Sequence, residues 1–160
     1  MNVIIPGSRQ TGKTTAASKL VERLRANGKT VAGFLCPGKN IVDLATGEER
    51  VFLSKEPVPG AQRTGPYYMS AEAIAFGEAA AKKQADYVFI DEYGKLELQE
   101  RGFYPLIKEL FPNNNCIILV RNINKEPFLE RFGKENCKVF ELTKENRDEL
   151  PQIIYKELLH

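Results

Sequence analysis

The 160-residue sequence is 42% hydrophobic and 28% charged, with a formal net charge of only +2. Its basic residues are spread along the chain, which excludes a nucleic-acid-binding tract and a polybasic membrane patch. No apolar run approaches membrane-spanning length, and a strand predicted at the N-terminus leaves no room for a signal peptide. We therefore expect a cytoplasmic protein with a single domain over residues 1–160 and no nucleic-acid or membrane partner. The oligomeric state is open, with a monomer favoured.

A glycine-containing loop lies between the first predicted strand and the first predicted helix. The strand covers residues 2–5, and apolar residues recur at helical spacing from Lys13 to about Asn27. Residues 7–14 between them read Gly-Ser-Arg-Gln-Thr-Gly-Lys-Thr and fit the phosphate-binding pattern G-x-x-x-x-G-K-[ST]. A strand, this loop and a helix, in this order, are the context that the motif requires. The alternative is an ordinary turn before a helix.

The chemistry of phosphate binding explains the spacing of this loop. Glycines let successive backbone N–H groups point at phosphate oxygens, and the helix that follows adds its positive end. Lys13 is expected to reach the β- and γ-phosphates of a nucleoside triphosphate, and the Thr14 hydroxyl is expected to hold Mg²⁺. Gln10 stands where many such loops have a third glycine, which leaves the local loop geometry open. The predicted nucleotide-binding residues of this segment are Gly7, Ser8, Arg9, Gln10, Thr11, Gly12, Lys13, Thr14 and Thr15.

An antiparallel hairpin is predicted as a small insertion beside the main sheet. It follows a buried strand at residues 30–36 and consists of two alternating segments, 40–44 and 49–53, around a glycine turn. Residues 54–66 contain three prolines and two glycines, which predicts a loop. Ser70 is the predicted N-cap of an alanine-rich helix.

Strands and helices alternate along the rest of the chain. Helices are predicted over about residues 102–111, from near Pro127, and after an N-cap at Thr143. This alternation predicts an α/β fold in which helices flank a mostly parallel sheet with right-handed crossovers. The main strands are expected near residues 2–5, 30–36, 87–91, 116–120 and 138–142, the last of them as part of the apolar segment 137–142. The buried stripe of the last helix is expected to consist of Leu150, Ile153, Ile154 and Leu158.

Two acidic residues follow one apolar strand directly. Asp91 and Glu92 stand at its carboxyl end, which is the edge where open α/β sheets bind their ligands. Asp91 is expected to hold Mg²⁺ through a water molecule, alongside Thr14. Glu92 is expected to accept a proton from, or to orient, the water that attacks the γ-phosphate. The alternative is that both acids are solvated in a turn.

The turn after these acids offers further candidates. Gly94 would permit a tight bend near phosphate, and Lys95 could add positive charge to the transition state, with Glu97 either orienting Lys95 or facing water. Arg121 follows another main strand and could neutralise the γ-phosphate or only cap the sheet. The predicted catalytic residues are thus Lys13, Glu92, Lys95 and Arg121, and Asp91, Glu92 and Gly94 join the nucleotide-binding set. Weaker candidates are Arg63 and Arg131 for a mobile arginine, and Tyr67, Tyr68 and Tyr93 for base stacking or aromatic packing.

The sequence resembles the thermophile-type nucleoside-triphosphatase family, small P-loop enzymes related to human cancer-related nucleoside-triphosphatase. The likeness rests on the phosphate loop, on 31–34 with the hairpin segment 41–47, on Ile90-Asp91-Glu92-Tyr93-Gly94-Lys95-Leu96-Glu97-Leu98, and on residues 142–150. The resemblance implies a RecA-like P-loop fold and Mg²⁺-dependent hydrolysis of several nucleoside triphosphates to diphosphate and phosphate, with loose base specificity. The chain departs from the family pattern at Gln10 and in a shortened region before the hairpin.

Two other functions remain open from the sequence. A small-molecule or nucleotide kinase would need an acceptor pocket and usually an arginine-rich lid, and Arg121 and Arg131 are few and far apart. A nucleotide-dependent switch or adapter would change shape when the γ-phosphate is lost. The start of the chain also resembles the molybdopterin-guanine-dinucleotide biosynthesis adapter family, but the histidine-rich segment expected there is missing, because the sole histidine is His160.

Overall fold

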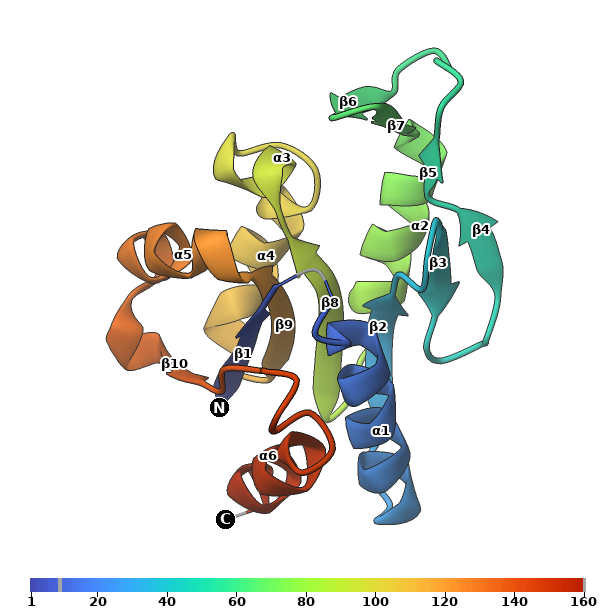
Figure 1. Cartoon of the computed structure of the whole chain (residues 1–160). Helices are drawn as coiled ribbons and strands as arrows, with labels where there is room; N and C mark the ends of the chain where they lie inside the picture. The colour runs from blue at the N-terminus through green and yellow to red at the C-terminus, as the bar shows by residue number, and fades with distance from the viewer. Residues whose placement is uncertain (9, 160) are drawn as a thin grey trace.

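A mostly parallel sheet forms the centre of the molecule (Figure 1). The computed structural model describes residues 1–8 and 10–159 of the chain. In this described part the main sheet has the strand order β10-β1-β9-β8-β2-β3-β4, in which only β3 and β4 pair antiparallel to their neighbours. The strands are β1 (Asn2–Gly7), β2 (Val31–Leu35), β3 (Asn40–Asp43), β4 (Glu49–Val51), β8 (Tyr87–Tyr93), β9 (Cys116–Arg121) and β10 (Cys137–Val139).

Helices cover both faces of this sheet because successive side chains of a strand point to opposite sides. Val3 and Ile5 pack with the first and last helices, whereas Ile4 packs with the helices of the other face. The helices are α1 (Lys13–Ala26), α2 (Ala71–Ala81), α3 (Lys95–Leu98), α4 (Tyr104–Leu110), α5 (Lys125–Phe132) and α6 (Leu150–Leu158), with short 3₁₀ helices η1 (Phe111–Asn113), η2 (Asn122–Asn124) and η3 (Lys134–Asn136). Among the residues that the structure describes, no helix is both long and apolar enough to cross a membrane.

The sheet register brings the predicted site residues to one edge. Gly7 at the end of β1 lies opposite Arg121 at the end of β9, and Asp91 of β8 lies opposite Leu119. The predicted parallel sheet, the hairpin β3–β4 and the N-cap at Ser70, whose hydroxyl accepts a hydrogen bond from the Ala73 N–H, are confirmed.

The prediction of a loop over residues 54–66 was only partly right, because Ser54 and residues 62–64 lie in strands. This region contributes to a second, antiparallel sheet of order β5-β7-β6, made of β5 (Leu53–Ser54), β6 (Gln62–Thr64) and β7 (Tyr67–Met69). The prolines and glycines occupy the turns between these short strands; Gly60 and Gly65, for example, have φ of 77° and 58°. Runs of two or three residues are too short for alternation to identify them as strands.

The C-terminal region also differs from the prediction. Strand β10 ends at Val139, although the backbone N–H of Phe140 and of Leu142 still donate to carbonyls of β1. Thr143 does not cap α6: it forms reciprocal hydrogen bonds with Asn146 and closes a separate turn. In α6 itself, Ile153 is 46% exposed and lies outside the buried stripe.

Candidate active site

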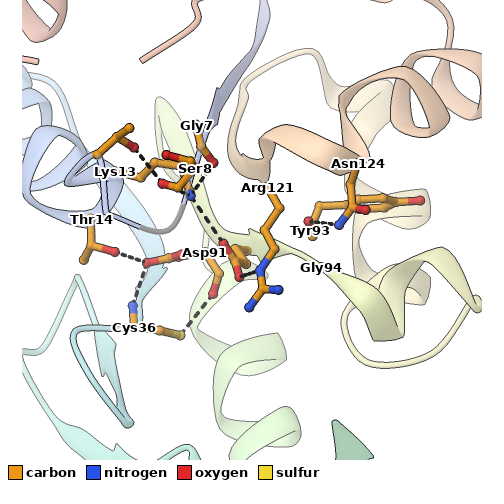
Figure 2. A network of polar contacts seen from close by, with 12 residues as sticks. Gly7, Ser8, Lys13, Thr14, Cys36, Asp91, Tyr93, Gly94, Arg121 and Asn124 are labelled. Carbon is orange, nitrogen blue, oxygen red and sulfur yellow. Dashed lines mark hydrogen bonds and ion pairs between the residues drawn. The ribbon is translucent and has the colours of Figure 1, made fainter. Parts of the chain in front are cut away.

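The phosphate-loop lysine is fixed inside its own loop. Lys13 is the first residue of α1 and is 7% exposed, and its Nζ donates to the backbone carbonyls of Gly7 at 2.7 Å and Ser8 at 3.2 Å (Figure 2). The Thr11 hydroxyl donates to the same Ser8 carbonyl at 2.8 Å. Gly12, which precedes α1, has a left-handed backbone with φ of 85° that glycine adopts without strain. The two lysine contacts hold the ammonium group against the carbonyl groups at the start of the loop.

The predicted pair of magnesium ligands lies together. The Thr14 hydroxyl donates to Asp91 Oδ2 at 2.9 Å, which joins α1 to the end of β8. The same carboxylate oxygen accepts the Cys36 N–H at 2.9 Å, and the Cys36 thiol donates to the Asp91 backbone carbonyl at 3.0 Å. Cys36 was not among the predicted site residues. It follows β2, the strand that pairs with β8, so the adjacency of strand ends was the signal that could have identified it.

Burial changes the acidity of Asp91. Burial of the side chain, with a smaller contribution from the nearby Glu92 charge, raises the pKa of Asp91 to about 7. Hydrogen bonds from the Cys36 N–H and the Thr14 hydroxyl act in the opposite direction. The carboxyl group is therefore poised to gain its charge when a cation arrives.

The raised pKa of Asp91 predicts a pH-dependent stability. Between the unfolded value of about 3.9 and the folded value of about 7, the Asp91 carboxyl group binds more protons in the folded chain than in the unfolded chain. This contribution is complete at low pH and is lost as the pH rises towards 7. We expect the contribution of Asp91 to the free energy of unfolding, measured with urea in the absence of nucleotide and metal, to fall over this window.

Asp91→Asn should make this pH dependence shallower, since the substituted amide does not titrate. Asp148→Asn, which removes an exposed carboxylate, is the matched control and should keep the wild-type slope. An Asp91→Asn chain with the full wild-type slope would contradict the assignment.

Glu92 lies between two cationic side chains. Its Oε1 accepts from Arg121 Nε at 3.2 Å, and its Oε2 lies 3.9 Å from Lys13 Nζ. The Glu92 side chain is 30% exposed, so water can reach it. The structure therefore joins three residues that the sequence placed separately: the loop lysine, the second acid of β8 and the arginine after β9.

Glu97 has neither of the two roles predicted for it. It is 4% exposed; its Oε1 accepts the Gly94 N–H and its Oε2 accepts the Phe103 N–H, both at 2.8 Å. Burial raises the pKa of Glu97 to about 7. Glu97 thus neither orients Lys95 nor faces water, but fixes the turn that follows the two acids. Lys95 begins α3 with an exposed side chain, and its catalytic role stays a prediction.

The structure places the weaker candidates in other contacts. Arg63 is exposed in β6, with its Nε donating to the Gly65 carbonyl. Arg131 of α5 pairs with Glu100 and donates to the Tyr104 hydroxyl. Tyr93 is buried in the core, where its ring packs edge-on against Phe128 with the ring centroids 4.9 Å apart, so it is not open to a base. The Lys39 ammonium group lies over the Tyr67 ring, 5.1 Å from its centroid. Gln10 and Thr15 are exposed, and Arg9 lies outside the described residues.

This geometry defines a class of protein. The chain has a strand, a glycine loop and a helix that begins with a buried lysine. The next residue of this helix, Thr14, donates a hydrogen bond to the carboxylate of Asp91 near the end of β8. These features place the chain among the P-loop nucleotide-binding proteins.

Comparisons with known proteins show the family. Residues 2–155 match the family model described as NTPase. Nucleoside-triphosphatase THEP1 of Methanopyrus kandleri is 31% identical, in an alignment that covers 99% of this chain and 95% of its own. The protein of the same name from Saccharolobus solfataricus is 32% identical, in an alignment that covers 99% of this chain and 93% of its own. The crystal structure of THEP1 from the hyperthermophile Aquifex aeolicus has a TM-score of 0.78 and 26% identity, with 100% of both chains covered. The chain therefore belongs to the nucleoside-triphosphatase family, which confirms the resemblance and the P-loop fold.

Proposed function

We propose that the protein is a Mg²⁺-dependent nucleoside-triphosphatase that converts ATP, GTP and other nucleoside triphosphates to the diphosphate and phosphate. Membership in a family of nucleoside-triphosphatases supports hydrolysis. The observation that carries the proposal is the position of Glu92, a water-accessible carboxylate held between Lys13 and Arg121 directly after Asp91.

The residues present fit a magnesium ion. Thr14 Oγ1 and Asp91 Oδ2 are hard oxygen donors that already lie 2.9 Å apart. Magnesium in nucleotide sites is usually held by one or two such side chains together with phosphate oxygens and water. When bound, the ion would supply positive charge that neutralises the β- and γ-phosphate oxygens.

The chain's own residues account for the proton and the charge in hydrolysis. Glu92 would accept a proton as the water oxygen bonds to the γ-phosphorus and the bond to the bridging oxygen breaks, which releases the diphosphate. Lys13 would turn its Nζ from its own loop carbonyls to phosphate oxygens, and Arg121 would stabilise the charge on the transferred group. All these groups lie at the carboxyl edge of the sheet, so little rearrangement is needed.

Substitution of Thr14 tests the metal part of the proposal. Thr14→Ala should lower phosphate release at limiting Mg²⁺ by roughly 10- to 100-fold, because it removes one of the two proposed ligands. Thr14→Ser keeps the hydroxyl and is the matched control, expected to behave like the wild type. Phosphate release should be measured over a Mg²⁺ titration, with chelator as the zero point. Equal Mg²⁺ dependence in both variants, or full activity in chelator, would contradict this role.

A further inference from the structure

The segment after β10 lies against the phosphate loop. The Leu142 N–H donates to the Pro6 carbonyl at 2.8 Å, one residue before the loop begins. Asn146 bonds reciprocally with Thr143 and donates through its side chain to the Glu141 carbonyl at 2.8 Å. The turn formed by residues 143–148 is therefore ordered, and Figure 1 shows the orange-red segment that contains it running from β10 towards α1 and α6.

One ion pair ties the far side of this turn to the first helix. Lys19 Nζ of α1 lies 3.5 Å from Asp148 Oδ1. Asn146 thus anchors the turn, and the exposed Lys19–Asp148 pair adds a weak contact with α1 on the other side of the residue between them. That residue is Arg147, whose side chain is exposed.

The Arg147 side chain approaches the phosphate loop at Gly12. Its Cδ lies 4.0 Å from the position that a Cβ on Gly12 would take, so its aliphatic stem lies close to the loop just before Lys13. In the sheet order, β10 lies on one side of β1, whereas β9 and β8 lie on the other. The segment that carries Arg147 thus follows β10 and reaches the phosphate loop from that side, whereas Glu92 and Arg121 belong to β8 and β9 on the other side of β1.

If the proposed function holds, this placement indicates where the γ-phosphate end and the base end of a bound nucleotide would lie. The γ-phosphate would lie towards Glu92 and Arg121, and the ribose and base would then lie on the side of the 143–148 turn. We propose that the guanidinium group of Arg147 stacks on the face of the nucleobase. A planar guanidinium stacks on any base without reading its hydrogen-bonding edge, which gives a physical reason for loose base specificity.

Binding measurements with and without a base test this role. Calorimetry should compare ATP, GTP, CTP and UTP with inorganic tripolyphosphate, all with Mg²⁺, on the full chain. Arg147→Ala should weaken all four nucleotides by about tenfold and leave the affinity for tripolyphosphate unchanged, because tripolyphosphate has no base to stack. Arg147→Lys keeps the positive charge but lacks the planar guanidinium group, and should behave like Arg147→Ala. Lys144→Ala removes an exposed cation from the same turn and should bind like the wild type.

Three other outcomes would contradict the stacking of Arg147 on the base, and each has a different meaning. Wild-type nucleotide affinity in Arg147→Ala would show that the base lies elsewhere, with the proposed function intact. A loss of tripolyphosphate affinity that Arg147→Lys restores would assign Arg147 to a phosphate instead. A wild-type chain that binds neither nucleotides nor tripolyphosphate would overturn the proposed function, and this inference with it.

Discussion

Glu92→Gln is expected to abolish most phosphate release while the protein still binds nucleoside triphosphate. The amide can keep the hydrogen bond from Arg121 Nε but cannot accept a proton from the attacking water. General-base catalysis contributes about 10²- to 10⁴-fold, and we expect turnover to fall within that range. Phosphate release at saturating Mg-ATP measures the loss, and equilibrium binding of Mg-ATP checks that the affinity is retained.

A carboxylate far from the loop provides the control for this variant. Glu109→Gln removes the partner of Lys82, on an exposed surface of α4, and should leave turnover unchanged. Unchanged turnover in Glu92→Gln itself would move the catalytic role to Lys95, to Arg121 or to water alone.

Lys13→Ala should lose most of its affinity for nucleoside triphosphate. Hydrogen bonds to charged groups contribute about 1.5–3 kcal/mol each, and Lys13 would reach two phosphates, so a loss of roughly 100-fold or more in affinity is expected. Equilibrium binding of Mg-ATP is the measurement. Arg23→Ala, which removes an exposed charge near the other end of α1, should bind like the wild type.

Folding must be separated from binding in this variant, because Lys13 also donates to the carbonyls of Gly7 and Ser8. Lys13→Met retains most of the buried aliphatic stem and serves as a second variant. Thermal unfolding should show a cooperative transition for at least one of the two. Tight Mg-ATP binding by a folded Lys13 variant would contradict the phosphate-loop assignment.

The fold and the centre of the site could be predicted because they rest on local signals. The phosphate loop is a contiguous pattern, and Asp91 and Glu92 end an apolar strand that can only be buried. Parallel strands bring their carboxyl ends to one edge, which is why the meeting of Thr14 with Asp91 followed from the sequence.

Other features depend on contacts between distant segments and left no local signal. Glu97 was predicted either to orient Lys95 or to face water, yet it is buried and accepts hydrogen bonds from the Gly94 and Phe103 N–H groups. The contact between Arg147 and the loop requires the path of the chain after β10, where Thr143 closes a turn rather than capping a helix. The strands of the small sheet are too short to show alternation.

Phosphate release from ATP, GTP, CTP and UTP with Mg²⁺ is the most direct test of the proposed function. The account predicts comparable release from all four, with one diphosphate formed for each phosphate. Tight binding with almost no release would contradict it. A kinase or a nucleotide-dependent switch would then be favoured, and the search would turn to an acceptor molecule or a protein partner.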